Sequence, residues 1–407
     1  MRPPLVFAAR RAPYPLENGA RIRTHHLLEG LAQSFEVVFV TFEHHRDSPD
    51  GLCRKADLER LYPNVEVVTV PGNGPAKRRG QVLTLVRRGS WAWGRYRSVA
   101  LAEAVERAAA RRGPCIVHFD DLGVALAGPV KGALSVYSAH NVEQRIHALS
   151  ARSGSPLRRA FSLIEARKVR AEEDYVWRSM DLSLAVSSLD GEAMTAGGAR
   201  HVALCPNGAP PVKRLPVRPR LEDEPLRLLF VGTGSYTPYR RGLAWFVREA
   251  LPRIEELTPV LLEVVGDPPA RAVEAPAVRY VGRVPSVEPF YAASHAVVVP
   301  VFEGSGTRLK ILEAMAYGRP VISTGLGAEG LPVVAGEHYL AAEDAGAFAT
   351  AADRIAGWAL DPTDGDVSRM IESAHEAVQP LYWPGVTERL VELYRSELGR
   401  LGQPVAT

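Results

Sequence analysis

Short apolar runs alternate with amphipathic stretches along the first half of the chain. Compact apolar runs rich in β-branched residues are typical of buried strands, and apolar positions spaced by three and four residues are typical of helices. The pattern predicts strands at 5–9, 36–42, 65–70, 116–119, 134–138 and 182–187. It predicts an amphipathic helix over 24–34 and a long charged helix over 156–180. This alternation indicates an α/β fold with a doubly wound parallel sheet.

The second half repeats the alternation after an irregular stretch. Residues 209–225 contain five prolines and no periodic apolar pattern, which is typical of a linker between domains. A second series of strands is predicted at 226–231, 261–265, 278–281, 296–300 and 321–324. We therefore expect two Rossmann-like domains, at 1–208 and 226–380, followed by a C-terminal helix within 381–407.

Composition is that of a soluble globular protein. The 407 residues suffice for two domains, and 46% hydrophobic with 23% charged residues are ordinary values. No apolar run is long enough to predict a transmembrane helix, and the apolar stretch near the N-terminus is too short for a signal peptide. Three widely spaced cysteines indicate reduced thiols without zinc-ligand spacing. A bacterial cytoplasmic location is expected.

Positive charge is concentrated in one segment. Residues 76–112 contain ten Lys or Arg and two Glu, so they carry +8 in a chain whose formal net charge is +3. The same segment contains Trp91, Trp93 and Tyr96. A solvated helical face explains this composition, and so does peripheral contact with an anionic membrane surface. A nucleic-acid partner is not expected, because no nucleic-acid-binding motif is present.

The stretch from residue 296 to residue 324 carries the most chemistry. It predicts a strand, a Gly-Ser-Gly-Thr turn at 304–307, a helix from about 307 to 317, and a second parallel strand. Gly318 ends the helix and Pro320 prevents its continuation. A glycine-rich turn before a helix N-terminus directs backbone N–H groups at an anion such as phosphate. The turn is neither a Walker motif nor Gly-x-Gly-x-x-Gly.

Glu313 lies within the apolar stripe of this helix. Leu309, Leu312 and Ala316 occupy the same face, so the carboxylate is predicted to point toward the interior. A buried carboxylate needs hydrogen-bond donors, and the vicinal hydroxyls of a ribose would supply them. Solvation at the stripe edge, or hydrogen bonds from nearby backbone, is the alternative.

These residues resemble the donor-binding segment of retaining glycosyltransferases of family 4, which have the two-domain GT-B fold. Glu313 with Ala-Met-Ala-Tyr-Gly-Arg-Pro-Val at 314–321 matches the second half of the family pattern. The first Glu of that pattern is replaced by Ser305, and 304–313 fit a branch that has Gly-Ser-Gly-Thr-Arg-x-Lys-x-x-Glu. The resemblance spans nearly the whole chain. It implies two Rossmann-like domains facing a central cleft, with a final helix, 384–401, crossing back to the N-terminal domain.

The resemblance also assigns residues on the acceptor side. Residues 13–24 match the glycine-rich loop after the first strand, where Gly19 would let the backbone approach the donor. His140, after the predicted strand 134–138, matches a histidine that lines the cleft beside the donor sugar. Gly19 and His140 are therefore the catalytic candidates, and Glu143 is an acceptor-side candidate. Without the resemblance, an ordinary Asn-Gly turn and a structural histidine are the alternatives.

On the donor side the resemblance implies contacts to a nucleoside diphosphate sugar. Backbone groups near Val284 would recognise the base, and Glu313 the ribose. The remaining donor-binding candidates are Gly232, Gly234, Arg240, Arg241, Ser305, Gly306, Thr307, Arg308 and Lys310. No cofactor or metal is expected, since Asp120 and Asp121 are adjacent and do not form the Asp-x-Asp of metal-dependent enzymes.

The expected function is retaining transfer of a sugar from a nucleoside diphosphate sugar to an acceptor hydroxyl. The acceptor is a small-molecule natural product, a polysaccharide or a lipid-linked glycan. A lipid-linked acceptor would suit peripheral contact of 76–112 with the inner face of the cell membrane. A GT-B nucleotide-sugar epimerase and a non-catalytic nucleotide-sugar binding protein are the alternatives, the latter because Ser305 replaces the first Glu.

Overall fold

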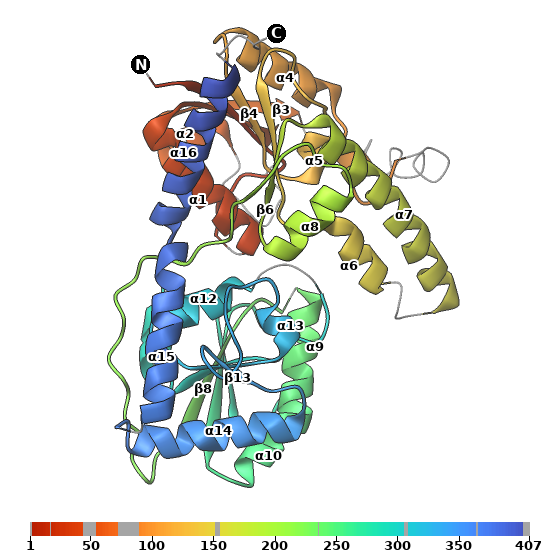
Figure 1. Ribbon diagram of the computed structural model, residues 1–407. Coiled ribbons are helices and arrows are strands. Elements are labelled where there is room, and N and C mark those ends of the chain that lie inside the picture. The colour runs from red at the N-terminus through yellow and green to blue at the C-terminus, as the bar shows by residue number, and fades with distance from the viewer. Residues whose placement is uncertain are drawn as a thin grey trace. The chain divides into compact units, whose positions relative to one another are not determined.

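The computed structural model describes residues 2–16, 18–43, 54–71, 89–150, 155–234, 236–304, 308–363 and 365–401. The chain divides into two compact units, one formed by Met1–Pro206 with Pro384–Thr407 and the other by Asn207–Trp383. Each unit is a parallel sheet covered by helices (Figure 1). Across the described ranges, no helix combines the length and the apolar content that crossing a membrane requires.

The first unit contains a seven-stranded parallel sheet with the order β3-β2-β1-β4-β5-β6-β7. Its strands are β1 Pro4–Ala9, β2 Glu36–Glu43, β3 Val65–Pro71, β4 Ile116–Phe119, β5 Leu134–Ser138, β6 Leu182–Ala185 and β7 Val202–Leu204. The strand order reverses at β1, where Ala8 is in register with Phe119 of β4. In open α/β sheets, ligands bind at the carboxyl ends of the strands beside such a switch point.

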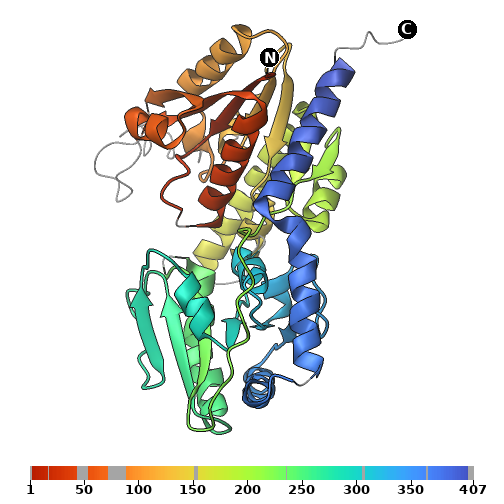
Figure 2. The ribbon, with the colours of Figure 1, turned by 90° about the vertical axis from the view of Figure 1, so that its left-hand side faces the viewer.

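The described helices of the first unit are α1 Gly19–Ser34, α2 Lys55–Leu61, α4 Val99–Ala110, α5 Leu122–Ala125, α6 Glu143–Ser150, α7 Pro156–Ser179, α8 Ser188–Ala196 and α16 Trp383–Leu401, with a 3-10 turn, η1, at Gly94–Tyr96. Helix α16 lies beside α1 (Figure 2), and a Cβ on Gly30 of α1 would be 2.6 Å from the Thr387 side chain. Glycine at position 30 therefore permits the close approach of the two helices. The expected return of the last helix to the N-terminal unit is confirmed.

The second unit contains a six-stranded parallel sheet with the order β10-β9-β8-β11-β12-β13. Its strands are β8 Leu226–Val231, β9 Val260–Val265, β10 Val278–Gly282, β11 Ala296–Val299, β12 Val321–Ser323 and β13 Leu340–Ala341. Its described helices are α9 Thr237–Trp245, α10 Leu251–Glu255, α11 Glu288–Ala293, α12 Leu309–Ala316, α13 Gly325–Ala328, α14 Ala345–Leu360 and α15 Gly365–Val378, with a π-helical turn, η2, at Phe246–Ala250 and a 3-10 turn, η3, at Gln379–Leu381.

Apolar side chains alternate between the two faces of this sheet. Leu228 and Phe230 point to a core shared with α9, α10 and α14, whereas Leu229 packs in a second core with the buried face of α12. Helix α12 ends as predicted, because Gly318 adopts φ +70°, a conformation that favours glycine. The second core fixes α12 and the side chains it carries on the sheet.

Residues 209–225, predicted as a linker, lie within the second unit. The Leu215 N–H donates to the Tyr317 carbonyl at 3.1 Å, and the Arg220 N–H donates to the Ala359 carbonyl at 2.7 Å. Arg319 Nη2 donates to the Pro216 carbonyl at 2.9 Å. The proline-rich stretch is thus an extended strap hydrogen-bonded to helix ends and loops. Side chains of the stretch hold it as well, since Arg214 pairs with Glu372 and Arg218 hydrogen-bonds to His295.

The α/β fold class with two Rossmann-like parallel sheets is confirmed. The predicted strands agree with the observed ones to within two residues at each end. Helix α1 begins at Gly19, five residues before the predicted start, because the Asn18 side chain caps it by accepting a 3.1 Å hydrogen bond from the Arg21 N–H.

Candidate functional site

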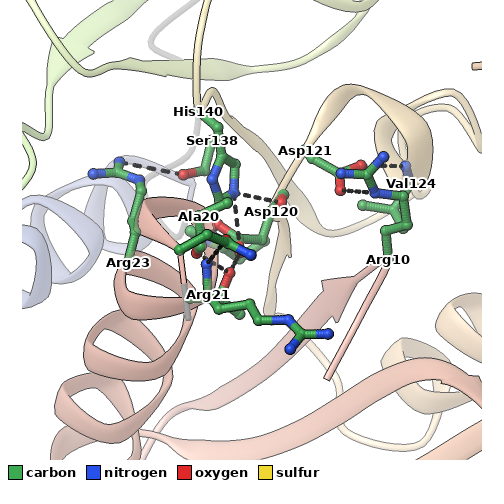
Figure 3. A network of polar contacts seen from close by, with 12 residues as sticks. Arg10, Ala20, Arg21, Arg23, Asp120, Asp121, Val124, Ser138 and His140 are labelled. Carbon is green, nitrogen blue, oxygen red and sulfur yellow. Dashed lines mark hydrogen bonds and ion pairs between the residues drawn. The ribbon is translucent and has the colours of Figure 1, made fainter. Parts of the chain in front are cut away.

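A cluster of charged side chains gathers at the carboxyl edge of the first sheet (Figure 3). Arg10 follows β1, Asp120 and Asp121 follow β4, and His140 follows β5. The first turns of α1 add polar groups to the same place. These residues line a pocket of about 110 Å³ whose other walls include Ala9, Arg11, Asn18, Ala20, Arg21, Thr24, Trp93, Asn141 and Glu143. The pocket lies at the switch point of the sheet, where ligands are expected.

Asp120 organises the centre of this cluster. Its fully buried carboxylate lies 3.3 Å from His140 Nε2 and 3.5 Å from His118 Nε2, and it accepts a hydrogen bond from the Thr24 hydroxyl. Although burial opposes ionisation, the two histidines hold the pKa of Asp120 well below its usual range. The Asp120 carboxylate is therefore a fixed negative charge beneath the pocket.

His140 is positioned by Asp120 from two directions. Its Nε2 also lies 2.9 Å from the Asp120 backbone carbonyl, so this nitrogen carries the proton. Burial lowers the pKa of His140, but the charge and hydrogen bond of Asp120 together raise it above the ordinary value. Nδ1 is buried and makes no hydrogen bond within the part of the chain that the structure describes. Asp120 thus favours the protonated form of the imidazole, and Nδ1 is left without a hydrogen-bond partner among the described residues.

Arg10 was not identified from the sequence. Its guanidinium lies 4.8 Å from the Trp93 ring centroid and 4.7 Å from that of Tyr96, and its Nε is 3.0 Å from Asp121 Oδ2. Two aromatic faces and a carboxylate hold the cation in place at the end of β1. An arginine directly after the first predicted strand was the signal that could have found it.

Glu143 begins α6 and lines the same pocket. Burial raises its pKa to about 7, although the nearby Arg10 works in the opposite direction. The backbone N–H groups of Glu143 and Gln144 donate to Glu173 of α7 at 2.6 and 3.0 Å. Glu173 is fully buried, and burial raises its pKa to about 8. Glu173 thus anchors the start of α6 and, with it, the position of Glu143.

Gly19 is the first residue of α1 and is exposed. It does not line the pocket, which its neighbours Asn18 and Ala20 do. The structure therefore brings together the catalytic candidate His140 and the acceptor-side candidate Glu143, whereas Gly19, the other catalytic candidate, lies outside the pocket at the start of α1.

In the second unit, Glu313 projects from α12 toward α11. Its Oε2 accepts a 2.9 Å hydrogen bond from the hydroxyl of the fully buried Tyr291. Burial raises the pKa of Glu313, and the Tyr291 hydrogen bond and the Lys310 charge partly offset this effect. The Glu313 carboxylate thus points inward, as its place in the apolar stripe predicts, and the Tyr291 hydroxyl supplies a hydrogen-bond donor. Tyr291, twenty-two residues earlier in the chain, was missed from the sequence.

Lys310 lies under the end of β8. Its ammonium donates to the Val231 carbonyl and lies 3.4 Å from the ring centroid of Tyr239. A Cβ at Gly232 would be 2.6 Å from this nitrogen, so glycine there leaves room for the lysine. Burial, with the charge of Arg308, lowers the pKa of Lys310 well below its ordinary value. Gly232 and Lys310 therefore lie together at the carboxyl edge of the sheet.

The other predicted donor-side residues are more dispersed. Arg241 pairs with Glu303 at 2.6 Å, whereas Arg240 is exposed and reaches Thr237 Oγ1 at 3.3 Å. Arg308 is buried at the N-cap position of α12. The Gly234 N–H donates to the Asp267 carbonyl at 2.7 Å, and Val284 packs partly buried on the second core. Ser305, Gly306 and Thr307 lie outside the described residues, as do 76–88 of the basic segment.

Among the described residues one group has the composition of a metal site, His25, His26 and Glu29 on α1. None of the three lines the pocket. Asp120 and Asp121 point to different partners, His140 and Arg10.

Comparison with known proteins gives the same fold. Residues 225–357 match the model of the family described as glycosyl transferases group 1. No curated protein sequence matches the chain. Sucrose-phosphate synthase from Thermosynechococcus elongatus superimposes with a TM-score of 0.67 at 18% identity, covering 98% of this chain and 100% of that one.

Two further solved structures agree. Anabaena HepE, in complex with UDP and glucose, has a TM-score of 0.62 at 15% identity and covers 97% of this chain and 100% of its own. The α,α-trehalose 6-phosphate synthase of Burkholderia multivorans has a TM-score of 0.61 at 13% identity, covering 98% and 100%. Residues 225–357 therefore match the glycosyl transferases group 1 model, and the whole chain has the two-domain fold of these solved structures.

Proposed function

We propose that this protein is a retaining glycosyltransferase of the family 4 type. It moves a sugar from a nucleoside diphosphate sugar to an acceptor hydroxyl and needs neither a metal nor a cofactor. The observation that carries the proposal is the partly buried Glu313 on α12, inside the segment that matches glycosyl transferases group 1. Such a carboxylate is suited to a ribose, whose two hydroxyls are donors.

The donor is held mainly by the second unit. Tyr291 occupies Oε2 of Glu313, so Oε1 is the oxygen that would receive the ribose hydroxyls. The diphosphate would lie near Gly306, Thr307 and the N-terminus of α12, where backbone N–H groups and the helix dipole favour negative charge. Lys310 would add charge from below. Arg241 could contribute only after leaving its ion pair with Glu303.

Chemistry needs little from the protein beyond positioning and electrostatics. The bond between the anomeric carbon and the diphosphate oxygen breaks, and the acceptor oxygen bonds to the same face of that carbon. The acceptor proton passes to the departing diphosphate, which serves as the base. His140, whose pKa is raised by Asp120, would in its protonated form stabilise negative charge on the donor. Glu143 would contact the acceptor.

UDP-sugars are the first donors to test. HepE, one of the similar structures, was solved with UDP and with UDP-glucose. Recognition of the base through backbone near Val284 leaves no side-chain signature, so the nucleotide must be measured.

A lipid-linked acceptor would place the first unit at a membrane surface. Trp91 of the basic segment meets Phe161 of α7 edge to face, with 6.5 Å between ring centroids. Leu157, Phe161 and Ile164 form an exposed apolar stripe on α7 with 83%, 41% and 51% of their surface accessible. Exposed Arg159 and Arg167 lie on the same helix. Salt-sensitive binding to anionic vesicles would support a lipid-linked acceptor, and no binding would favour a soluble one.

The decisive experiment has two stages. Thermal denaturation is followed with UDP, GDP, ADP and dTDP and their sugars, and the nucleotide that stabilises the wild type is titrated into Glu313→Ala. Weaker binding in the variant supports the donor site, whereas unchanged affinity overturns it. Turnover is then assayed with candidate acceptors, and proton NMR of the product reads the anomeric configuration.

The same assay separates the two alternatives. Conversion of the donor sugar without an acceptor would identify an epimerase. Donor binding without turnover for any acceptor class would identify a non-catalytic binding protein, the outcome that the Ser305 replacement keeps open. An inverted anomeric centre in the product would overturn the retaining mechanism.

A further inference from the structure

Three side chains of metal-binding type lie together on α1. His25, His26 and Glu29 each offer one ligand atom, and these atoms lie within 4.8 Å of one another. All three project from one helix, so the helix and not a loop fixes the spacing of their Cα atoms. The side chains of His25 and Glu29 are 20% and 57% exposed, which leaves an entry path for an ion.

The distances suit a tetrahedral ion. Zinc bonds to imidazole nitrogen and carboxylate oxygen are about 2.0–2.2 Å long, so tetrahedral angles place neighbouring ligand atoms about 3.4 Å apart. His25 Nε2 lies 3.5 Å from Glu29 Oε2. The His26 ring lies beside that of His25, with 4.9 Å between centroids. Because all three ligand atoms already lie within 4.8 Å of one another, the distances that involve His26 must shorten by no more than about 1.4 Å to reach the tetrahedral spacing.

An outer-shell partner orients the first ligand. The Tyr62 hydroxyl lies 2.6 Å from His25 Nδ1, so Nδ1–H can donate to it and Nε2 is left with its lone pair toward Glu29. Tyr62 ends α2 and is buried, which fixes the hydroxyl. Metal-bound histidines almost always have such a partner on the other ring nitrogen. The hydrogen bond between His25 and Tyr62 supplies the outer-shell contact that a histidine ligand needs.

The geometry points to a zinc site in which His25, His26 and Glu29 supply three ligands and water the fourth. The ion would link two successive turns of α1. Thr24, the residue directly before His25 on this helix, donates a hydrogen bond to Asp120. Its role would be to stabilise that helix. Zinc binding here is independent of the glycosyl transfer proposed above, and no step of the transfer passes through it.

The test uses the full-length protein, with any purification tag removed and metal stripped by a chelator. Zinc chloride is titrated in competition with a chromophoric chelator, and the melting temperature is recorded with and without zinc. One ion is expected to bind and to raise the melting temperature. Glu29→Gln and His26→Gln should each weaken binding at least about 10-fold, since even an outer-shell partner is worth 10–100-fold. Tyr62→Phe should weaken it about 10-fold for that same reason.

A matched control exists in the same unit. His201 and Glu397 form a histidine–carboxylate pair with 3.7 Å between ligand atoms, and no second histidine joins them among the described residues. His201→Gln should bind zinc as the wild type does. The proposed site is overturned if the wild type binds zinc no more tightly than Glu29→Gln does. It is also overturned if His201→Gln loses as much zinc affinity as Glu29→Gln. Because Glu29 is mostly exposed, Glu29→Gln is expected to fold, and its circular dichroism spectrum checks this.

Discussion

The Tyr291 hydroxyl donates a 2.9 Å hydrogen bond to Oε2 of Glu313 and thereby fixes the carboxylate of α12 from a neighbouring helix. Tyr291 is itself held by Tyr317, on which it stacks with 4.7 Å between ring centroids. Oε1 of Glu313 makes no hydrogen bond to any of the described residues. One oxygen is thus used for orientation and the other is left for a ligand.

Glu313→Gln should weaken binding of the preferred nucleotide about 10- to 100-fold, because a hydrogen bond to a charged group contributes about 1.5–3 kcal/mol. Tyr291→Phe should weaken it less, since it removes orientation and leaves the ribose contact. Isothermal titration calorimetry measures both affinities. Glu376→Gln, at an exposed position on α15, serves as the control and should bind as the wild type does. A larger loss in Tyr291→Phe than in Glu313→Gln would contradict this division of roles.

Lys310 should take up a proton when the donor binds. Burial lowers its pKa well below the ordinary 10.5, which favours the neutral amine in the free protein, whereas a nearby diphosphate would favour the charged form. Donor affinity should therefore fall as pH rises from the pKa of Lys310 in the free protein to its higher pKa in the donor complex. Calorimetry at one pH in two buffers of different ionisation heat counts the protons. Lys310→Met should abolish the uptake, and equal uptake in that variant would assign the proton to another group.

The position of Glu313 could be predicted because it depends on a local rule, the spacing of apolar residues in a helix. Its partner Tyr291 could not, because α11 and α12 meet only through the packing of the second core. The strand ends before Asp120 and His140 could also be predicted from a local rule, the extent of an apolar run. Their contact depends on β4 lying next to β5, which is a property of sheet order and not of sequence spacing.

Helix α1 contains sequence signals that its apolar pattern alone does not show. Asn18 is a strong capping residue, and it moves the helix start to Gly19, which the apolar pattern alone did not indicate. The His-His-x-x-Glu spacing at 25–29 was equally visible, and helical geometry places such residues near one another. The outer-shell role of Tyr62 was not visible, because it comes from another element.

Asp120→Asn should lower the free energy of unfolding by about 3–5 kcal/mol, because it leaves buried polar groups without their charged partner. Because the pKa of Asp120 is depressed, its ionisation contributes fully to the free energy of unfolding above pH 3.8, and this contribution is lost as pH falls toward the depressed pKa. Because the pKa of His140 is raised, its protonation contributes fully to the free energy of unfolding below pH 6.5, and this contribution is lost as pH rises through the raised pKa. The destabilisation should therefore be larger at pH 6 than at pH 9.

Urea denaturation of wild type and Asp120→Asn at both pH values measures this difference. Glu103→Gln, which removes an exposed carboxylate 3.2 Å from Arg107, is the control and should change the free energy of unfolding by no more than about 0.5 kcal/mol. A destabilisation that is the same at pH 6 and pH 9 would show that His140 does not depend on Asp120 for its charge.

The stability of Glu173→Gln relative to wild type should increase as pH rises. Burial raises the pKa of Glu173 from 4.5 to about 8, so the folded state holds this proton more tightly than the unfolded state, and wild-type stability falls between those two pH values. One such group changes the free energy of unfolding by at most about 1.4 kcal/mol per pH unit. Glutamine does not titrate, and its amide oxygen can accept from one of the two N–H groups that Glu173 binds, so the loss of the other hydrogen bond lowers stability by an amount that does not vary with pH. The difference between variant and wild type should grow by at least about 1 kcal/mol between pH 5 and pH 8.5, a range over which one titration contributes that much.

The measurement is urea denaturation of both proteins across that pH range, with Glu192→Gln as the control. Glu192 is exposed on α8, so its substitution should leave stability within about 0.5 kcal/mol of wild type at every pH. A constant difference between Glu173→Gln and wild type would mean that Glu173 is ionised in the folded protein throughout. Its two backbone hydrogen bonds to α6 would then outweigh burial, and Glu143 would be held by a charge at the helix N-terminus.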